Sequence, residues 1–237
     1  MRIAVVIPVY NEARYIKQCL DALVDQSRVP DEVIIVDNNC TDATIAIAKK
    51  YVFVKVINEI QQGICAATKK GLDEAAQSSD IIMRCDADSI PPKKWVEDAE
   101  RYLFESSAIA VTGPGIFTGL HGVRRWLASL LYMKMYFWSV GLALGQKPLF
   151  GSNFAITATA WKSISTSTHL ARQDIHDDID ISYHLSRIGS LLYKEDFQMP
   201  ISHRPFMSLH KLMQRYPIGL RSIIIHWPDQ APWRSRK

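Results

Sequence analysis

The sequence contains few cysteines and none of the familiar cysteine spacings. The four cysteines are Cys19, Cys40, Cys65 and Cys85, and no two of them form a Cys-x-x-Cys pair. This scarcity argues against a disulfide framework or a zinc site and fits a reducing cytoplasm. The first residues also lack a charged and then apolar leader with a small-residue cleavage site, so export is not expected.

The turn after the first strand-like run has no glycine. It reads Pro8-Val9-Tyr10-Asn11-Glu12, whereas a dinucleotide site of the Rossmann type needs Gly-x-Gly-x-x-Gly at this point. A Walker A loop is missing from the sequence as well. Phosphate is therefore not expected to bind in either of these two ways.

Acidic and basic residues are unevenly distributed along the 237 residues. The net charge is +4, but residues 201–237 carry +6 and residues 121–150 carry +4, which leaves −6 on the remainder. An acidic body with basic outer segments suggests a metal site joined to a surface that meets anions, although a solvated basic tail is the alternative. With 48% hydrophobic and 22% charged residues, the chain has the composition of one large globular domain, with or without an appendage.

Short apolar strands alternate with helical patterns through the first hundred residues. The expected strands are β-branched and show little alternation, which is typical of strands covered on both faces. They are Ile3–Val9, Glu32–Asp37, Val52–Ile57 and Ile81–Cys85, and helices are expected at Ala13–Asp25, Asp42–Lys50, Gly63–Gln77 and Trp95–Phe104. This alternation predicts an α/β fold with a mainly parallel central sheet and helices on both faces.

The pattern changes after residue 106. Strands are expected at Ala108–Thr112, Phe150–Ala155 and Ser190–Tyr193, and a helix is expected at Asp177–Gly189. Between them, Trp126–Leu144 is apolar, rich in aromatic residues and close to the roughly 20 residues of a membrane span. Lys134 near its middle makes spanning costly, so a core helix is favoured, an interfacial helix is the close second, and membrane insertion stays open.

The sequence Asp86-Ala87-Asp88 follows an apolar run that ends at Cys85. Carboxylates at positions i and i+2 just past a buried strand project to the same side of the chain. Together they can hold one divalent cation through hard oxygen ligands and leave its other positions to water and a diphosphate. A solvated Asp-x-Asp turn is the alternative for so short a motif.

Four motifs occur in one order along the chain. They are Val5-Val6-Ile7-Pro8-Val9-Tyr10-Asn11-Glu12, Val33-Ile34-Ile35-Val36-Asp37-Asn38-Asn39-Cys40-Thr41-Asp42, Asp86-Ala87-Asp88 and Asp177-Asp178-Ile179-Asp180-Ile181. Taken together, the motifs resemble those of the family 2 glycosyltransferases, which have the GT-A fold, and they cover about residues 1–195. The last motif is similar to the Glu-Asp-x-Asp-Leu pattern of that family, with Asp177 in place of Glu.

The resemblance implies a GT-A catalytic domain at residues 1–200. Its nucleotide-binding half would comprise residues 1–105. Its acceptor half would comprise residues 106–200 and include the apolar helical segment 121–147. Residues 201–237 would follow as a basic amphipathic C-terminal tail.

The resemblance also implies roles in donor binding. The nucleotide of a nucleotide-diphosphate sugar would be bound by Pro8, Tyr10, Glu12, Asp37 and Asp86. Asp37 would accept a hydrogen bond from the base, with capping of the following turn as its alternative role. Asp88 would bind a Mg or Mn ion directly and Asp86 would act between the ribose and the metal, so that the cation stabilises the departing diphosphate.

The acceptor side of the implied site centres on Asp178, which matches the general base of inverting family members. The alternative is that Asp177, Asp178 and Asp180 only complement the helix dipole. Asp177 and Asp180 are candidates for supporting roles. Gly151-Ser152-Asn153 resembles the strand segment that borders the acceptor, where Asn153 would bond an acceptor hydroxyl, and a tight strand start is an equal alternative.

Two departures from the family pattern limit the resemblance. The helix after the third strand reads Ala67-Thr68-Lys69-Lys70-Gly71, where many relatives have Ala-Arg-Asn-x-Gly, so contacts from an arginine here are lost. The Gln-x-x-Arg-Trp motif of processive synthases is absent from the sequence. Processive polymer synthesis is therefore not expected.

The expected function is that of an inverting, metal-dependent glycosyltransferase that acts on a hydroxyl or phosphate acceptor in cell-envelope or lipid-linked glycan synthesis. A cytoplasmic location is expected, with the basic segments in peripheral contact with anionic lipid on the inner face of the cytoplasmic membrane, and no nucleic-acid partner. The alternatives are a nucleotidyltransferase and a non-catalytic nucleotide- or carbohydrate-binding module. The donor sugar, the base, the acceptor and the oligomeric state are left open.

Overall fold

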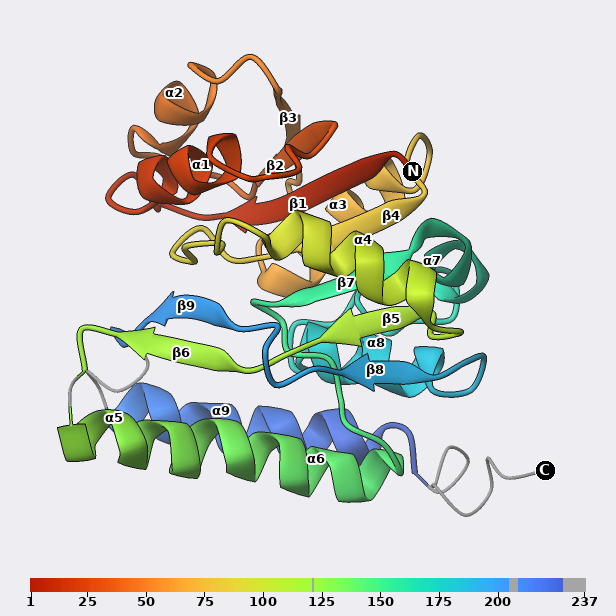
Figure 1. The fold of residues 1–237 in the computed structure, drawn as a ribbon. Coiled ribbons are helices and arrows are strands. Elements are labelled where there is room, and N and C mark those ends of the chain that lie inside the picture. Colours follow the sequence, from red (N-terminus) through yellow and green to blue (C-terminus); the bar gives the residue numbers. More distant parts are fainter. Residues whose placement is uncertain (121, 205–208, 228–237) are drawn as a thin grey trace.

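A seven-stranded sheet forms the centre of the molecule in the described residues (Figure 1). The computed structural model describes residues 1–120, 122–204 and 209–227. The strand order is β3-β2-β1-β4-β7-β5-β8. The strands are β1 (Ile3–Val9), β2 (Glu32–Asp37), β3 (Val54–Asn58), β4 (Ile81–Arg84), β5 (Ala110–Thr112), β7 (Phe154–Thr157) and β8 (Leu191–Tyr193).

The strands run mainly parallel, as the sequence predicts. β1 pairs in parallel with both β2 and β4, and β3 continues the parallel sheet beyond β2. Only β7 runs against its neighbours among these seven strands, since it pairs antiparallel with β4 and β5. This reversal places the start of β7 beside the end of β4, with Phe154 opposite Arg84.

Helices cover both faces of the sheet. They are α1 (Ile16–Val24), α2 (Thr44–Ala48), α3 (Ile64–Ala75), α4 (Trp95–Glu105), α5 (Gly122–Ala128), α6 (Met135–Leu144), α7 (Ala158–Ile164), α8 (Asp177–Leu185) and α9 (Leu209–Ile224), with a π-helical segment η1 (Ser129–Lys134) between α5 and α6. Successive residues of a strand point to opposite faces. Accordingly, Val5 and Ile7 pack with α1 and α4, whereas Ala4 and Val6 pack with α3, α7 and α8.

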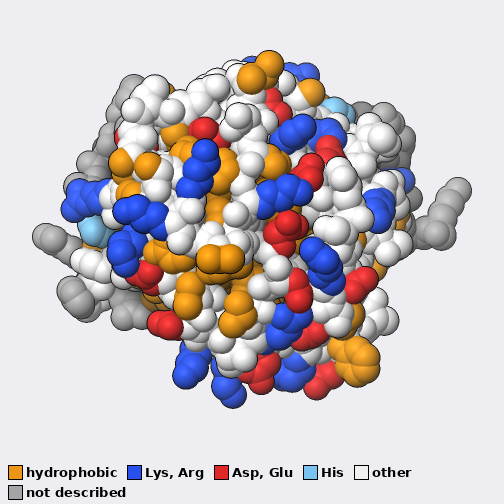
Figure 2. Space-filling model, turned by 90° about the horizontal axis from the view of Figure 1, so that it is seen from above, with side chains coloured by type: hydrophobic (Ala, Val, Ile, Leu, Met, Phe, Trp, Pro, Cys, Tyr) orange, Lys and Arg blue, Asp and Glu red, His pale blue; other side chains and the backbone are white. Residues whose placement is uncertain are grey.

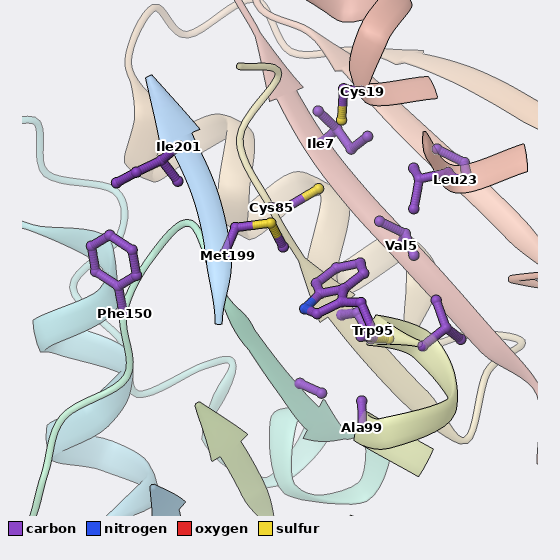
Figure 3. Packing of buried hydrophobic residues seen from close by; sticks show 14 of the residues in the cluster. Val5, Ile7, Cys19, Leu23, Cys85, Trp95, Ala99, Phe150, Met199 and Ile201 are labelled. Carbon is purple, nitrogen blue, oxygen red and sulfur yellow. The ribbon is translucent and has the colours of Figure 1, made fainter. Parts of the chain in front are cut away.

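The core on the first face centres on Trp95 (Figure 3). Its indole is 1% exposed and stacks on Phe197, with ring centroids 6.3 Å apart. The same cluster includes Met199 of β9 (Met199–Ser202), which pairs in parallel with β6 (Gly115–Thr118) to form a small second sheet. This packing fixes the second sheet against the first.

The apolar segment predicted around Trp126–Leu144 forms the α5–η1–α6 layer, which runs along the lower edge of Figure 1. Phe137 and Val140 are buried, whereas Trp126 and Trp138 are each 61% exposed. The segment therefore has one core face and one exposed face. Across the described ranges, no helix combines the length and hydrophobicity needed to cross a bilayer.

The expected strands and helices are confirmed in type, and the differences lie at boundaries and in short elements. The strand expected at Phe150–Ala155 begins at Phe154, because Phe150 and Asn153 bridge across a tight turn. The short elements β6, β9 and α7 are not among the expectations. The basic tail expected at 201–237 contains the end of β9 and the whole of α9. Residues 205–208 and 228–237 lie outside the described residues.

Helix α3 packs closely on the sheet at Gly71. A Cβ atom there would collide with Val6 Cγ1 and would lie 2.8 Å from Val36 Cγ2. We expect Gly71→Ala to lower the free energy of unfolding by about 1–3 kcal/mol, the usual cost of overpacking a core. Denaturant unfolding measures this change. Gly141→Ala in α6 is the matched control, because the nearest atom to a Cβ there, the Gln146 carbonyl oxygen, would lie 3.5 Å away. Equal stability of the two variants would contradict the prediction.

Candidate functional site

The ends of β1, β2 and β4 meet at one edge of the sheet. Val9 and Asp37 are register partners at the ends of β1 and β2, and β4 runs parallel to β1 and leads directly into Asp86 and Asp88. In open parallel sheets, ligands bind beyond the carboxyl ends of the strands. The topology therefore collects the predicted donor residues at the edge where a nucleotide would be expected.

The loops after β1 and β2 support each other. Asn11 has a left-handed backbone with φ of 56°, and its side-chain oxygen accepts a hydrogen bond from the Thr41 N–H at 2.8 Å. Asp37 accepts one from the Cys40 N–H at 2.9 Å, so it caps the turn that follows β2. Pro8 is buried in β1, whereas the Tyr10 side chain is exposed at the edge.

Asp86 is held by two neighbours from different elements. One carboxylate oxygen accepts a hydrogen bond from the Ser152 hydroxyl at 2.5 Å, and the other lies 3.0 Å from the guanidinium of Arg84. Arg84 is only 3% exposed. Burial alone lowers the pKa of Arg84, but the carboxylates of Asp177, Asp86 and Asp178 raise it above its ordinary value. The arginine therefore stays charged inside the protein.

Asp88 and Glu12 share a second arginine. The guanidinium of Arg204 donates hydrogen bonds to Asp88 Oδ2 at 2.6 Å and to Glu12 Oε2 at 3.0 Å. Burial raises the pKa of both carboxyl groups, and the charge of Asp86 raises the pKa of Asp88 further, although Arg204 opposes the shift in each case.

The chemistry of this carboxylate group fits a divalent cation. Glu12, Asp86 and Asp88 provide several hard oxygen atoms, which is the donor set that Mg²⁺ and Mn²⁺ prefer. Arg204 supplies positive charge at the same place, which indicates that the arrangement of carboxylates stabilises a cation there. Asp86 and Asp88 are thus suitable ligands for the ion that the sequence motif predicts.

Asp177 and Asp178 lie in the first turn of α8. Asp178 Oδ2 accepts a hydrogen bond from the Gly151 N–H at 2.9 Å, and burial followed by the charge of Asp177 raises its pKa above the ordinary value. Asp177 accepts a hydrogen bond from the Thr68 hydroxyl at 2.8 Å and lies 3.3 Å from Arg84.

Two connections bring the start of α8 to the end of β4. The consecutive residues Gly151 and Ser152 bind Asp178 and Asp86 respectively. The guanidinium of Arg84 bridges Asp86 and Asp177. Carboxylates separated by about ninety positions in the sequence therefore belong to one connected group.

Asn153 and Asp180, which the sequence places on the acceptor side of the site, are both buried in the protein interior. Asn153 is fully buried; its side-chain oxygen accepts a hydrogen bond from Trp95 Nε1 at 2.8 Å, and its amide donates to the Phe197 carbonyl at 2.5 Å. These bonds favour the strand-start role over contact with an acceptor. Asp180 is also fully buried and faces His169, His184 and His226.

Several residues of the site are not among the sequence predictions. Arg84 had a recognisable signal, because a charged residue inside an apolar strand needs a buried partner. Ser152 lies in the Gly151-Ser152-Asn153 segment, but no role is expected for its side chain, and Arg204 had no signal of its own. A serine near a strand and an arginine in a basic tail are common features, and only the folded chain brings them to Asp86 and Asp88.

Comparison with protein families decides the classification. The model of glycosyl transferase family 2 matches residues 4–169, which is most of the chain. The chain belongs to this family. Among its relatives is the glycosyltransferase AglE of Haloferax volcanii, which is 35% identical over 102 residues; the match covers 40% of this chain and 33% of AglE. The chain thus spans about a third of that relative's length.

Several solved structures share the fold. Residues 1–349 of S. aureus TarS superpose with a TM-score of 0.70 at 18% identity, covering 99% of this chain and 68% of that one. A second structure is that of glucosyl-3-phosphoglycerate synthase of Mycobacterium tuberculosis, crystallised with Mn²⁺, UDP-glucose and phosphoglyceric acid. It gives a TM-score of 0.63 at 20% identity, and the match covers 94% of this chain and 79% of the synthase. At these identities the likeness shows the fold alone, and it confirms the predicted GT-A architecture.

The contacts of Asn153 predict a stability effect for this family 2 member. Asn153→Ala leaves the buried Trp95 N–H and the Phe197 carbonyl without their partner. We expect a loss of about 1–3 kcal/mol for each unsatisfied group, measured by denaturant unfolding. Asn58→Ala, at an exposed position of β3, is the control and should stay within about 0.5 kcal/mol of the wild type. A stable Asn153→Ala protein would argue for a free amide that meets the acceptor.

Proposed function

We propose that this chain is an inverting, metal-dependent glycosyltransferase. It would move a sugar from a nucleotide-diphosphate donor to a hydroxyl or phosphate acceptor of a cell-envelope or lipid-linked glycan. The observation that carries the proposal is the link through Gly151 and Ser152, which joins the candidate base Asp178 to the candidate metal ligand Asp86. A base and a leaving-group site must lie on one reacting sugar, and this link supports that arrangement.

The donor would bind along the ends of β1, β2 and β4. Tyr10 offers an exposed ring beside the base, and Asp37 lies at the end of β2, where it would accept a hydrogen bond from the base. Asp86 and Asp88 would hold a Mg²⁺ or Mn²⁺ ion, which supplies Lewis-acid stabilisation of the departing diphosphate. The guanidinium of Arg204 bonds Oδ2 of Asp88, so the ion would bind through Oδ1 or would displace the arginine.

The transfer step follows from the position of Asp178. Its carboxylate takes the proton of the acceptor hydroxyl while the acceptor oxygen forms a bond to the anomeric carbon of the sugar. The bond from that carbon to the diphosphate oxygen breaks on the opposite face, and its electron pair leaves with the nucleoside diphosphate. A single displacement of this kind inverts the anomeric centre. The hydrogen bond from the Gly151 N–H orients the carboxylate for this role.

The assignment of Asp178 as the base predicts a separation of catalysis from donor binding. Asp178→Asn should lower nucleoside diphosphate release from a panel of nucleotide sugars with Mn²⁺ by about 10²- to 10⁴-fold, the usual contribution of a general base. The same variant should keep the rise in melting temperature caused by a nucleoside diphosphate with Mn²⁺. Near-normal release by Asp178→Asn would remove the base assignment.

Two further variants make that experiment selective. Asp88→Ala should lose the rise in melting temperature as well as product release, because it removes a metal ligand. Asp25→Asn replaces an exposed aspartate just after α1 and should behave as the wild type in both assays. Release of pyrophosphate in place of a nucleoside diphosphate would identify a nucleotidyltransferase.

An exposed apolar surface supports peripheral contact with a membrane. On α6, Met135, Trp138 and Leu142 are exposed at helical spacing, and Leu220, Ile224 and Trp227 repeat the pattern on α9 and the turn after it. Both helices lie in the lower layer of Figure 1. The face seen from above, in Figure 2, instead mixes acidic and basic side chains around its hydrophobic ones. Amphipathic helices with tryptophan and basic residues are typical of membrane interfaces.

This surface predicts a lipid-dependent location. Replacement of both Trp138 and Leu142 by Glu should weaken co-sedimentation with anionic liposomes at least about tenfold, because each side chain contributes about 1.5–3 kcal/mol when buried. Val52→Glu is the matched control, since Val52 is fully exposed just before β3. Equal binding by all three proteins, or no binding by the wild type, would contradict a membrane role for this surface.

A further inference from the structure

Four potential metal ligands converge around α8, and none of them takes part in the proposed transfer step. Asp180 and His184 lie on α8, His169 lies in the loop after α7, and His226 follows the end of α9. One nitrogen or oxygen atom of each side chain lies within 4.8 Å of the corresponding atoms of the others. Asp180, His184 and His226 are buried. Three elements distant in sequence therefore deliver one ligand set to a single point.

The distances within this histidine–aspartate cluster approach those of a tetrahedral site. Asp180 Oδ1 lies 2.9 Å from His169 Nδ1, 3.0 Å from His226 Nε2 and 3.7 Å from His184 Nε2. For a zinc ion with bonds of about 2.0–2.1 Å, neighbouring ligand atoms are about 3.4 Å apart. The imidazole rings are also evenly spaced, with centroids 5.1–5.4 Å apart.

Two of the histidines lack the hydrogen bonds that a buried imidazole normally makes. Within the described part of the chain, His184 Nε2 and both ring nitrogens of His226 are shielded from solvent and have no hydrogen-bond partner. His226 Nε2 approaches Asp180 without forming a hydrogen bond. Most buried polar atoms in proteins are satisfied, so these nitrogens call for another partner. A metal ion between the rings and the carboxylate would supply it.

Outer contacts hold the ligands in place. The second carboxylate oxygen of Asp180 accepts a hydrogen bond from the His169 backbone N–H at 2.8 Å. The ring of Tyr183 stacks on His226, with centroids 4.3 Å apart and planes 8° apart. Asp180 and His184 are four residues apart on one helix, which places their side chains on the same face. Contacts of this kind orient ligands in known metal sites.

We propose that His169, Asp180, His184 and His226 bind one structural zinc ion. Imidazole nitrogens suit zinc and related transition metals better than Mg²⁺ or Ca²⁺, which prefer oxygen ligands. Four protein ligands complete a tetrahedral shell, which is the pattern of structural zinc sites. The scarcity of cysteine does not bear on this site, because its ligands are histidine and aspartate. The proposal is independent of glycosyl transfer.

The zinc ion would fasten α9 to α8. The two helices already meet where the backbone N–H of His176 donates a hydrogen bond to the Ser222 hydroxyl at 2.7 Å. His176 and Asp180 are four residues apart, as are Ser222 and His226, so the second connection lies one helical turn beyond the first. The ion would therefore hold the C-terminal layer on the helix whose first turn carries Asp178.

Metal analysis of the untagged full chain tests the proposal. After expression with zinc and removal of loosely bound metal by gel filtration, the wild type should retain about one zinc ion per chain by mass spectrometry. His226→Gln and His184→Gln should each lose it, with affinity weakened more than about 100-fold, because loss of outer contacts alone costs 10- to 100-fold. Cobalt-substituted wild type should show the visible absorption of a tetrahedral ion.

Controls separate this site from the carboxylates at the sheet edge. His176→Gln removes a histidine outside the cluster, Asp88→Ala removes a proposed donor-site ligand, and both variants should retain the zinc. Removal of zinc from the wild-type protein with a chelator should lower the melting temperature of the protein, and addition of zinc should restore it. This measurement tests the proposal even if the ligand variants fold poorly. Wild type without zinc, or zinc retained by both His226→Gln and His184→Gln, would overturn the proposal and leave a cluster without a metal ion.

Discussion

The buried guanidinium of Arg84 is the interaction on which the site depends. It lies at the end of a central strand and contacts Asp86, just past β4, and Asp177 of α8. Such a charge is costly to bury and is tolerated only with good partners. The same contacts that neutralise it bring the two acidic motifs together. Gly151 contributes by having no side chain, since a Cβ atom there would collide with the Arg84 guanidinium.

Charge balance accounts for much of the remaining architecture. The sheet edge gathers Glu12, Asp86 and Asp88, whose mutual repulsion requires a cation. Arg204 provides one from the segment after β9, and the small β6–β9 sheet carries that segment to the edge. Met199 lies in the same buried cluster as Trp95 (Figure 3), and this packing positions β9, from which the chain continues to Arg204.

Helix α8 connects three parts of the molecule. Its first turn supplies Asp177 and Asp178 to the site, and its buried face carries Asp180 and His184. The end of α9 packs against it through Ser222 and His226. Along one short helix, alternate aspartates thus serve different environments: Asp178 binds the backbone of Gly151, whereas Asp180 faces three histidines. The acidic group at the sheet edge and the C-terminal packing are therefore linked through a single element.

The family and the main strands can be inferred from the amino-acid residues alone. Apolar β-branched runs such as Ile3–Val9 and Glu32–Asp37 bury the side chains of both faces only in a sheet that is covered on both sides. Acidic motifs that follow such strands in this order are typical of one family. The contacts of each polar side chain follow only from the folded chain. Asn153 is occupied by Trp95 and Phe197, Arg204 reaches Asp88 across 116 positions, and the histidines meet only after three elements fold together. Periodicity reports whether a residue faces the core, whereas a contact between distant segments depends on packing that no local pattern contains.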